Sequence, residues 1–219
     1  MPGVMHPDTP HSGCVATDVE TPVKIPGIAV CPRRGREYKF IRHNAARGNA
    51  EHRRSGKPIF DTEAIEQGQV PSRQMLQVGR VPIPAEAAQW LQAALDDEVV
   101  LRKRLQLLDG EPAVISTSYY PLWLAANTRL ESPEPLPEGP DELIENLGYH
   151  FSRGIEVFRA RMPSPQEVQL LRLGAGIPVV QMWNVDYGDR GRTLQAAEDL
   201  YAGDRHEFSY EWDEGDIKS

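Results

Sequence analysis

Two arginines on one predicted strand are the residues of this chain best suited to bind an anion. Arg102 and Arg104 lie two positions apart in the stretch from Glu98 to Pro121. Successive side chains of a strand alternate between its faces, so both guanidinium groups are expected on one face and Lys103 on the other. Two guanidinium groups on one face can bind a phosphate or a carboxylate through paired hydrogen bonds.

The same pair also has a purely structural explanation. An edge strand that carries solvated cations, or ion pairs with Glu156 or Glu198, would account for the arginines without any ligand. Tyr201 and the other aromatic residues of the predicted strands fit a core or an interface as well as a pocket wall. The residue chemistry alone therefore indicates a domain that binds a small anion or another small molecule, and it leaves a structural role open.

Other kinds of site find no support in the sequence. Cys14 and Cys31 are the only cysteines and have no metal-ligand spacing, while His150 and His206 are isolated along the chain. No nucleophile elbow, dinucleotide fingerprint or Walker motif is present. The sequence predicts no catalytic residue, no metal and no cofactor.

The arginines need a sheet to hold them, and the chain predicts one. Asp109-Gly110 between two apolar runs is a strong hairpin signal. Pro84 and the capping box Ser164–Glu167 mark helix starts. Further strands are expected over 59–65, 73–83, 154–161, 178–187, 192–201 and 206–212, and helices over 85–95, 141–146 and 165–173. The predicted class is α+β, a mostly antiparallel β-sheet flanked by short helices, with one face covered and the other left for a ligand or partner.

Charge is distributed unevenly along the 219 residues. The net charge is −8, yet the stretch from Arg33 to Lys57 holds nine Lys or Arg against two Glu. We expect a disordered or basic N-terminal arm over 1–57, one domain over 58–213 and a tail over 214–219. An acidic body repels nucleic acid phosphates. No apolar run is long enough for a membrane helix and the N-terminus lacks the order of a signal peptide, so a cytoplasmic protein without a membrane partner is expected.

From about residue 59 to 212, the order of several segments resembles the UTRA domain. This is the effector-binding and dimerisation module of the HutC subfamily of GntR-type bacterial transcription regulators. The resemblance is carried by VPIPAEAAQWL, VVLRKRLQLLDGEP, SYYP, SPQEVQLLRLGAGIPV and DRGRTLQAAEDLYAGDRHEFSYEW. It implies a chorismate-lyase-like fold, no enzymatic activity and a pocket for a small metabolite such as a sugar phosphate or a urocanate-like acid.

The resemblance also implies roles for individual residues. Arg104 matches the arginine that meets the anionic group of the ligand, and Gln106 stands where sugar-phosphate sensors have a second arginine. Ser116 and Gln195 are neutral where glutamate is frequent, and Tyr201 matches a pocket tyrosine. One cation among neutral partners suggests a ligand less charged than an amino-sugar phosphate. The expected ligand-binding residues are Arg102, Arg104, Gln106, Ser116, Gln195 and Tyr201.

The N-terminal region departs from the family. Residues 1–58 have neither the length nor the amphipathic helices of a winged helix-turn-helix. We therefore expect a small-molecule effector and a homodimer, or a heterodimer with a full-length relative, and DNA binding only where a winged-helix head is supplied. Two alternatives stay open. One is a chorismate-lyase-like enzyme, although no carboxylate is evident opposite the arginines. The other is a ligand-free interaction module that uses the strand ending at Trp212.

Overall fold

The computed structural model describes residues 40–43 and 58–210. The predictions for the N-terminal arm, for Trp212 and for the tail concern residues outside these ranges. The exception is residues 40–43 of the arm, which form a short strand. That strand is β1 (Phe40–His43), which pairs in parallel with β8 (His206–Ser209).

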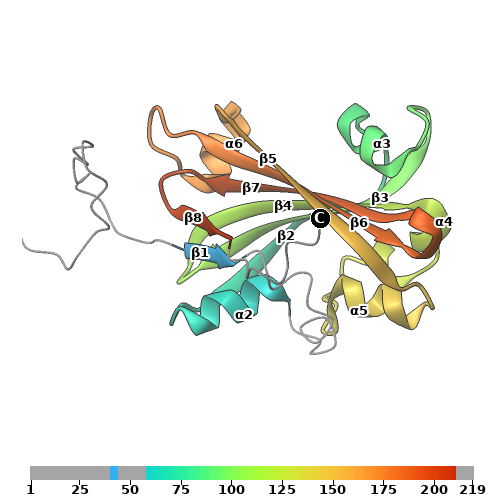
Figure 1. The fold of residues 1–219 in the computed structure, drawn as a ribbon. Helices are drawn as coiled ribbons and strands as arrows, with labels where there is room; N and C mark the ends of the chain where they lie inside the picture. The colour runs from blue at the N-terminus through green and yellow to red at the C-terminus, as the bar shows by residue number, and fades with distance from the viewer. Residues whose placement is uncertain (1–39, 44–57, 211–219) are drawn as a thin grey trace, which may run out of the picture. The chain divides into compact units, whose positions relative to one another are not determined.

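Six strands form one antiparallel sheet (Figure 1). In spatial order they are β2 (Pro71–Pro82), β3 (Glu98–Leu108), β4 (Glu111–Pro121), β7 (Thr193–Ala202), β6 (Val179–Gly188) and β5 (Phe151–Arg161). The α+β class and the mostly antiparallel sheet are confirmed. β3 and β4 are central strands, so the residues that they carry are covered by neighbours on both edges.

The hairpin between β3 and β4 forms as the sequence predicts. Asp109 and Gly110 both have positive φ, 52° and 81°. These values are required in a two-residue turn whose twist matches that of the two strands. The turn pairs Leu108 with Glu111 and Leu107 with Pro112, and a register shift between Gln106 and Leu107 then brings Arg104 opposite Ser116 and Arg102 opposite Ser118. The turn and this register shift together determine which residues of β4 share a row with each arginine.

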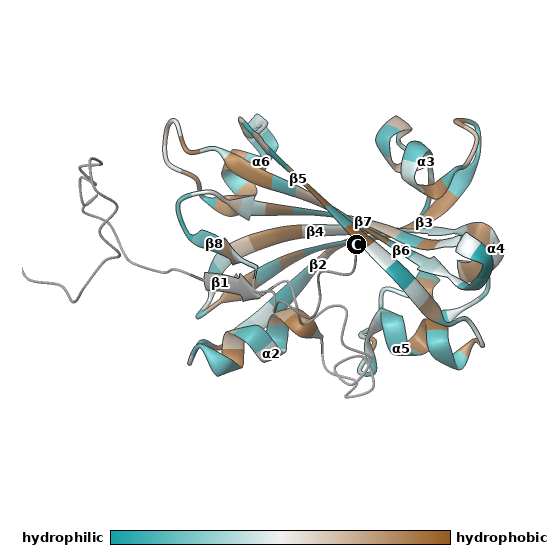
Figure 2. Ribbon diagram, viewed as in Figure 1, coloured by the Kyte–Doolittle hydropathy of each residue, from teal (hydrophilic) through white to brown (hydrophobic). Residues whose placement is uncertain are grey.

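Short helices lie on both faces of the sheet. They are α2 (Ile59–Glu66), α3 (Ala85–Leu91), α4 (Leu122–Ala125), α5 (Gly139–Asn146) and α6 (Pro165–Leu171), with 3-10 turns at Arg129–Glu131 and Asp189–Gly191. Figure 1 shows α3 and α6 on one side and α2 and α5 on the other. The expectation that helices cover only one face is wrong, because α2 and α5 also pack on the second face. Both appear in Figure 2 as mixed hydrophilic and hydrophobic ribbons, as helices with one buried face should.

Residues 59–65 form a helix and not the predicted strand. Pro58 is the N-cap residue, and its carbonyl oxygen accepts hydrogen bonds from the backbone N–H groups of Asp61 and Thr62 in the first turn. Phe60 and Ala64 are both buried and are four residues apart, which is the spacing of one helix face. The sequence predicts a strand here because the β-branched and aromatic residues of the segment are also typical of a short strand.

No helix among the described residues has both the length and the apolar character needed to cross a membrane.

Candidate functional site

A cavity of about 120 Å³ lies against the sheet face that carries α2 and α5. Strands β3, β4, β7 and β6 contribute its floor, and the beginnings of α2 and α5 line it as well. The lining residues on the four strands are Arg104, Gln106, Ser116, Ser118, Gln195, Ala197, Asp199, Asn184 and Asp186.

The face of β3 toward the cavity shows how the sequence builds the floor. Every second residue points to this face, and the order is Val100, Arg102, Arg104, Gln106 and Leu108. Val100 packs in an apolar cluster with α4 and α5, and Leu108 packs in a different cluster with α2. The strand is therefore apolar at its two ends and polar in the middle of one buried face.

The neighbouring strand β4 repeats this pattern. Tyr120 belongs to the cluster beneath α5 and Val114 to the cluster beneath α2, with Ser118 and Ser116 between them. Both serines are at most 3% exposed. Burying polar groups without a use for them costs free energy, so a polar band across a covered sheet face is typical of a binding site.

Four of the six sequence-predicted residues line this cavity. They are Arg104, Gln106, Ser116 and Gln195. Within the described part of the chain, the Arg104 guanidinium makes no hydrogen bond or ion pair. The geometry brings the four together, while their roles in binding a ligand stay a prediction.

Arg102 lies on the same face but is directed elsewhere. Its guanidinium donates to the carbonyl oxygens of Leu130 at 3.0 Å, Ser132 at 2.5 Å and Glu134 at 3.4 Å. The residue is 3% exposed, and burial lowers the pKa of Arg102 from its usual value. The suggestion of a solvated edge strand is wrong, since β3 is central and Arg102 is buried. The second predicted cation thus holds a loop and is not among the residues that line the cavity.

Tyr201 stands behind the cavity wall. It packs edge-on against Phe208 with ring centroids 5.0 Å apart, and its hydroxyl donates to Asp199 Oδ2 at 3.4 Å. Tyr201 does not line the cavity, but its partner Asp199 does. The side chain can therefore orient a lining carboxylate from behind.

The sequence did not identify the carboxylates of the lining. Asp199 shares a cross-strand row with Arg104, because both residues pair with Ser116. Asp186 lies opposite Gln195, and Gly154 leaves room for it, since a Cβ there would lie 3.1 Å from Asp186 Oδ1. No carboxylate lies directly opposite Arg104 on β4, but Asp199 lies in the same row one strand further on.

The lining holds several carboxylates, whereas we expected neutral side chains around the arginine. Its carboxylates are Glu138, Asp141, Glu142, Asp186 and Asp199, and Arg104 is the cation among the described lining residues. Glu138 is already paired with Arg129 at 2.5 Å. Among the described lining residues, Arg104 is thus the one cation beside several carboxylates, and Asp141, Asp186 and Asp199 have further interactions of their own.

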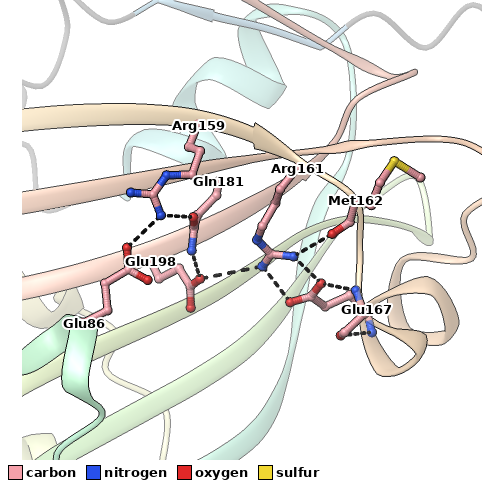
Figure 3. A network of polar contacts seen from close by, with 8 residues as sticks. Glu86, Arg159, Arg161, Met162, Glu167, Gln181 and Glu198 are labelled. Atoms are coloured by element: carbon pink, nitrogen blue, oxygen red, sulfur yellow. Dashed lines mark hydrogen bonds and ion pairs between the residues drawn. The ribbon is translucent and has the colours of Figure 1, made fainter.

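The opposite face of the sheet carries a separate polar network (Figure 3). Arg161 donates to both carboxylate oxygens of Glu167 at 2.8 Å and lies 3.9 Å from Glu198 Oε1. Gln181 Nε2 donates to Glu198 Oε1 at 2.5 Å. Burial raises the pKa of Glu198 above its ordinary value. Glu198 neighbours Asp199 in sequence, yet the two carboxylates point to different faces.

This raised pKa predicts a pH effect on stability. The folded protein keeps a proton on Glu198 at a pH where the unfolded chain has lost it, so the unfolding free energy should fall as pH rises from about 4.5 through the raised folded value. Glu198→Gln should remove this component. Urea denaturation between pH 4 and pH 7 checks it, with the exposed Glu66→Gln as control. Identical pH slopes for the wild type and Glu198→Gln would contradict the prediction.

Comparisons with known proteins agree on one kind of molecule. The UTRA domain family model matches residues 66–207. An uncharacterised HTH-type transcriptional regulator of Streptomyces coelicolor is 31% identical over 138 residues, which cover 62% of this chain and 51% of that protein. The chain thus matches about half the length of this curated relative.

Solved structures with the same fold include effector and C-terminal domains of regulators. The effector domain of PhnF from Mycobacterium smegmatis superposes with a TM-score of 0.62 at 20% identity, covering 70% of this chain and 94% of that one. The C-terminal domain of the histidine utilization repressor from Pseudomonas syringae gives 0.57 at 16% identity, with coverages of 66% and 99%. At these identities the likeness concerns the fold.

Proposed function

This chain belongs to the UTRA domain family, and from that premise we propose that it is the small-molecule-sensing, dimerising module of a GntR-type bacterial transcription regulator of the HutC subfamily. A small polar metabolite binds in the cavity on the sheet face, and its anionic group meets Arg104. The site binds this effector without converting it.

The observation that carries the proposal is the environment of Arg104. A guanidinium that lines a cavity, with no partner among the described residues, is suited to bind a carboxylate or phosphate in two hydrogen bonds. Gln106, Ser116 and Ser118 are buried around it and add neutral polar groups that fix the orientation of a ligand.

The cavity walls explain how occupancy is transmitted. Its lining comes from five strands and from the first residues of α2 and α5, and these two helices belong to two separate apolar clusters. A ligand that contacts both helices favours one arrangement of the two clusters over others, and it shifts the population by its difference in affinity. In a dimer, this shift changes the spacing of attached DNA-binding heads. The partner is a second copy of this chain or a full-length relative.

A thermal-shift panel tests the sensing function. Glucose 6-phosphate, urocanate and hexanoate are added to the wild-type protein, and at least one should raise Tm. Saturation at 100 times Kd contributes about 2.7 kcal/mol, which corresponds to a rise of roughly 5 to 10 °C for a domain of this size. Sedimentation equilibrium should give a dimer, and incubation with chorismate should release no pyruvate. A monomer that no panel compound stabilises would overturn the proposal.

A further inference from the structure

Two amides in the cavity wall bond to the same carboxylate oxygen. Gln195 Nε2 donates to Asp186 Oδ2 at 2.7 Å, and Asn184 Nδ2 donates to it at 3.2 Å. The strands impose this arrangement, because Gln195 pairs with Asp186 across β7 and β6, and Asn184 lies two residues before Asp186 on the same face of β6. All three residues line the cavity. Asp186 thus holds the NH2 group of both amides.

This contact leaves the carbonyl oxygens of the two amides without donors. Both residues are 6% exposed, and Gln195 Oε1 is buried with no hydrogen-bond partner among the described residues. In the same part of the chain, no group donates to Asn184 Oδ1. Turning either amide over would set its oxygen against the carboxylate of Asp186, so the two hydrogen bonds fix the orientation. The wall therefore holds two acceptors in fixed orientation, and buried acceptors need donors.

The donor that fits this wall is a neutral group. Asp141 and Asp186 have further interactions of their own, so nothing here calls for a cation. A hydroxyl or an amide N–H donates a hydrogen to a carbonyl oxygen without adding charge. A ligand group that cannot donate would leave Gln195 Oε1 unsatisfied, which weakens binding.

We infer that Asp186 is a positioning residue of the effector site, and that the effector is an anion with a hydroxyl or amide N–H donor at the end remote from Arg104. Asp186 acts through Gln195 and Asn184, whose carbonyl oxygens accept hydrogen bonds from the ligand. The inference rests on the proposed function, because it names the class of ligand and a specificity-determining residue for the same cavity.

Gly154 provides the space that the Asp186 carboxylate occupies. The two residues pair across β5 and β6, and a Cβ at position 154 would lie 3.1 Å from Asp186 Oδ1. An alanine there would push the carboxylate aside by a few tenths of an ångström. Gly154 itself does not line the cavity. Its replacement therefore displaces Asp186 without removing a group that a ligand could contact.

The sheet sets the length of the ligands to be tested. β4 and β7 lie between β3 and β6, so Arg104 and Asn184 stand on strands about 14 Å apart. The long arginine side chain spans part of this distance. The remaining gap suits an anion whose donor is several bonds away from its charge.

Matched acids test the class of ligand. 6-Hydroxyhexanoate and 6-fluorohexanoate are titrated into the wild-type protein by calorimetry, because fluorine is close to a hydroxyl in size and donates no hydrogen. The hydroxy acid should bind about tenfold more tightly. Adipamate, which ends in a carboxamide, distinguishes an N–H from a hydroxyl donor. Pairs built on butyrate and octanoate vary the length, and the corresponding alkyl phosphates vary the anionic group.

Two variants test the positioning role through the ratio of the hydroxy-acid affinity to the fluoro-acid affinity. An asparagine at position 186 can turn its own NH2 group toward the two amides, so Asp186→Asn should lower the ratio from about ten to about one. Gly154→Ala should lower it by a smaller factor, and it keeps the test valid if Asp186→Asn folds poorly. Asp189→Asn removes an exposed carboxylate away from the cavity and should keep the wild-type ratio.

A double variant shows whether Asp186 acts through Gln195. Gln195→Met removes the acceptor itself and should also lower the ratio to about one, and adding Asp186→Asn should lower it no further. A purely structural role of Asp186 would lower Tm and leave the ratio of affinities at the wild-type value.

Two results would overturn the inference. They are equal binding of the hydroxy and fluoro acids at every length, or a wild-type ratio in both Asp186→Asn and Gly154→Ala. If the paired acids bind equally and Arg104→Met removes their binding, the sensing function stands and only the positioning role fails. If none of these anions binds and the thermal-shift panel is also negative, the proposed function fails as well.

Discussion

Replacing Arg104 with methionine is expected to weaken binding of anionic effectors at least 100-fold without destabilising the fold. The guanidinium lines the cavity and has no partner among the described residues, so its removal breaks no internal hydrogen bond there. The binding loss follows from two charge-assisted hydrogen bonds, each worth about 1.5 to 3 kcal/mol. The unfolding free energy should stay within about 0.5 kcal/mol of the wild type.

Lys103→Met is the matched control for Arg104→Met. Lys103 is adjacent on β3 and points to the other face, so the variant removes the same charge from the same strand without touching the cavity. Calorimetric titration with the panel compound that stabilises the wild type most should show no loss. Equal losses in the two variants would mean that Arg104 acts through long-range charge and does not contact the ligand.

Replacing Arg102 with methionine is expected to give the largest loss of stability. Its buried guanidinium satisfies the carbonyl oxygens of Leu130, Ser132 and Glu134, which would be left without this donor. We expect the unfolding free energy to fall by about 3 kcal/mol and Tm to fall by roughly 6 to 12 °C. Urea denaturation and calorimetry measure both quantities.

The contrast between the two arginines is the informative result. Arg102→Met should loosen the segment of residues 130–134 and make it the first site of limited proteolysis, while Arg104→Met should keep the wild-type cleavage pattern. If Arg102→Met instead retained wild-type stability and lost ligand binding, Arg102 would belong to the binding site and its contacts with the three carbonyls would be unimportant.

Much of the sheet follows from local sequence chemistry. The turn at Asp109-Gly110 predicts the hairpin, and the capping box at Ser164 and Glu167 is present, with both reciprocal hydrogen bonds formed. These signals are local, because turn and cap geometry depends on a few adjacent residues. The turn alone would place Arg104 opposite Ile115, and the register shift between Gln106 and Leu107 places it opposite Ser116.

The difference between Arg102 and Arg104 could not be predicted in this way. Alternation places both on one face, and this is correct. What separates them is the loop at Leu130–Glu134, which approaches from about 30 residues away and supplies carbonyls to Arg102 alone. No periodicity in the sequence records such a tertiary contact.

The lining carboxylates on β6 and β7, in contrast, could have been predicted by examining the two faces of each strand separately. On β6 the residues of one face run Met182, Asn184, Asp186, and on β7 Asp199 precedes Tyr201 on the same face. Polar residues thus replace apolar ones in the middle of strands that are otherwise buried. Asp141 could not be found in this way, since its position depends on how α5 packs.

The measurement that tests the central claim most directly is an NMR titration of the side-chain amides. Gln106, Asn184 and Gln195 line the cavity, while Gln181 belongs to the network on the opposite face. Glucose 6-phosphate, urocanate and 6-hydroxyhexanoate are added in turn to the labelled protein. We predict that at least one of them shifts the NH2 signals of the three cavity amides and leaves those of Gln181 in place. Shifts at Gln181 without shifts at the cavity amides would contradict the assignment of the effector site to this face of the sheet, and so would the absence of any shift with all three compounds.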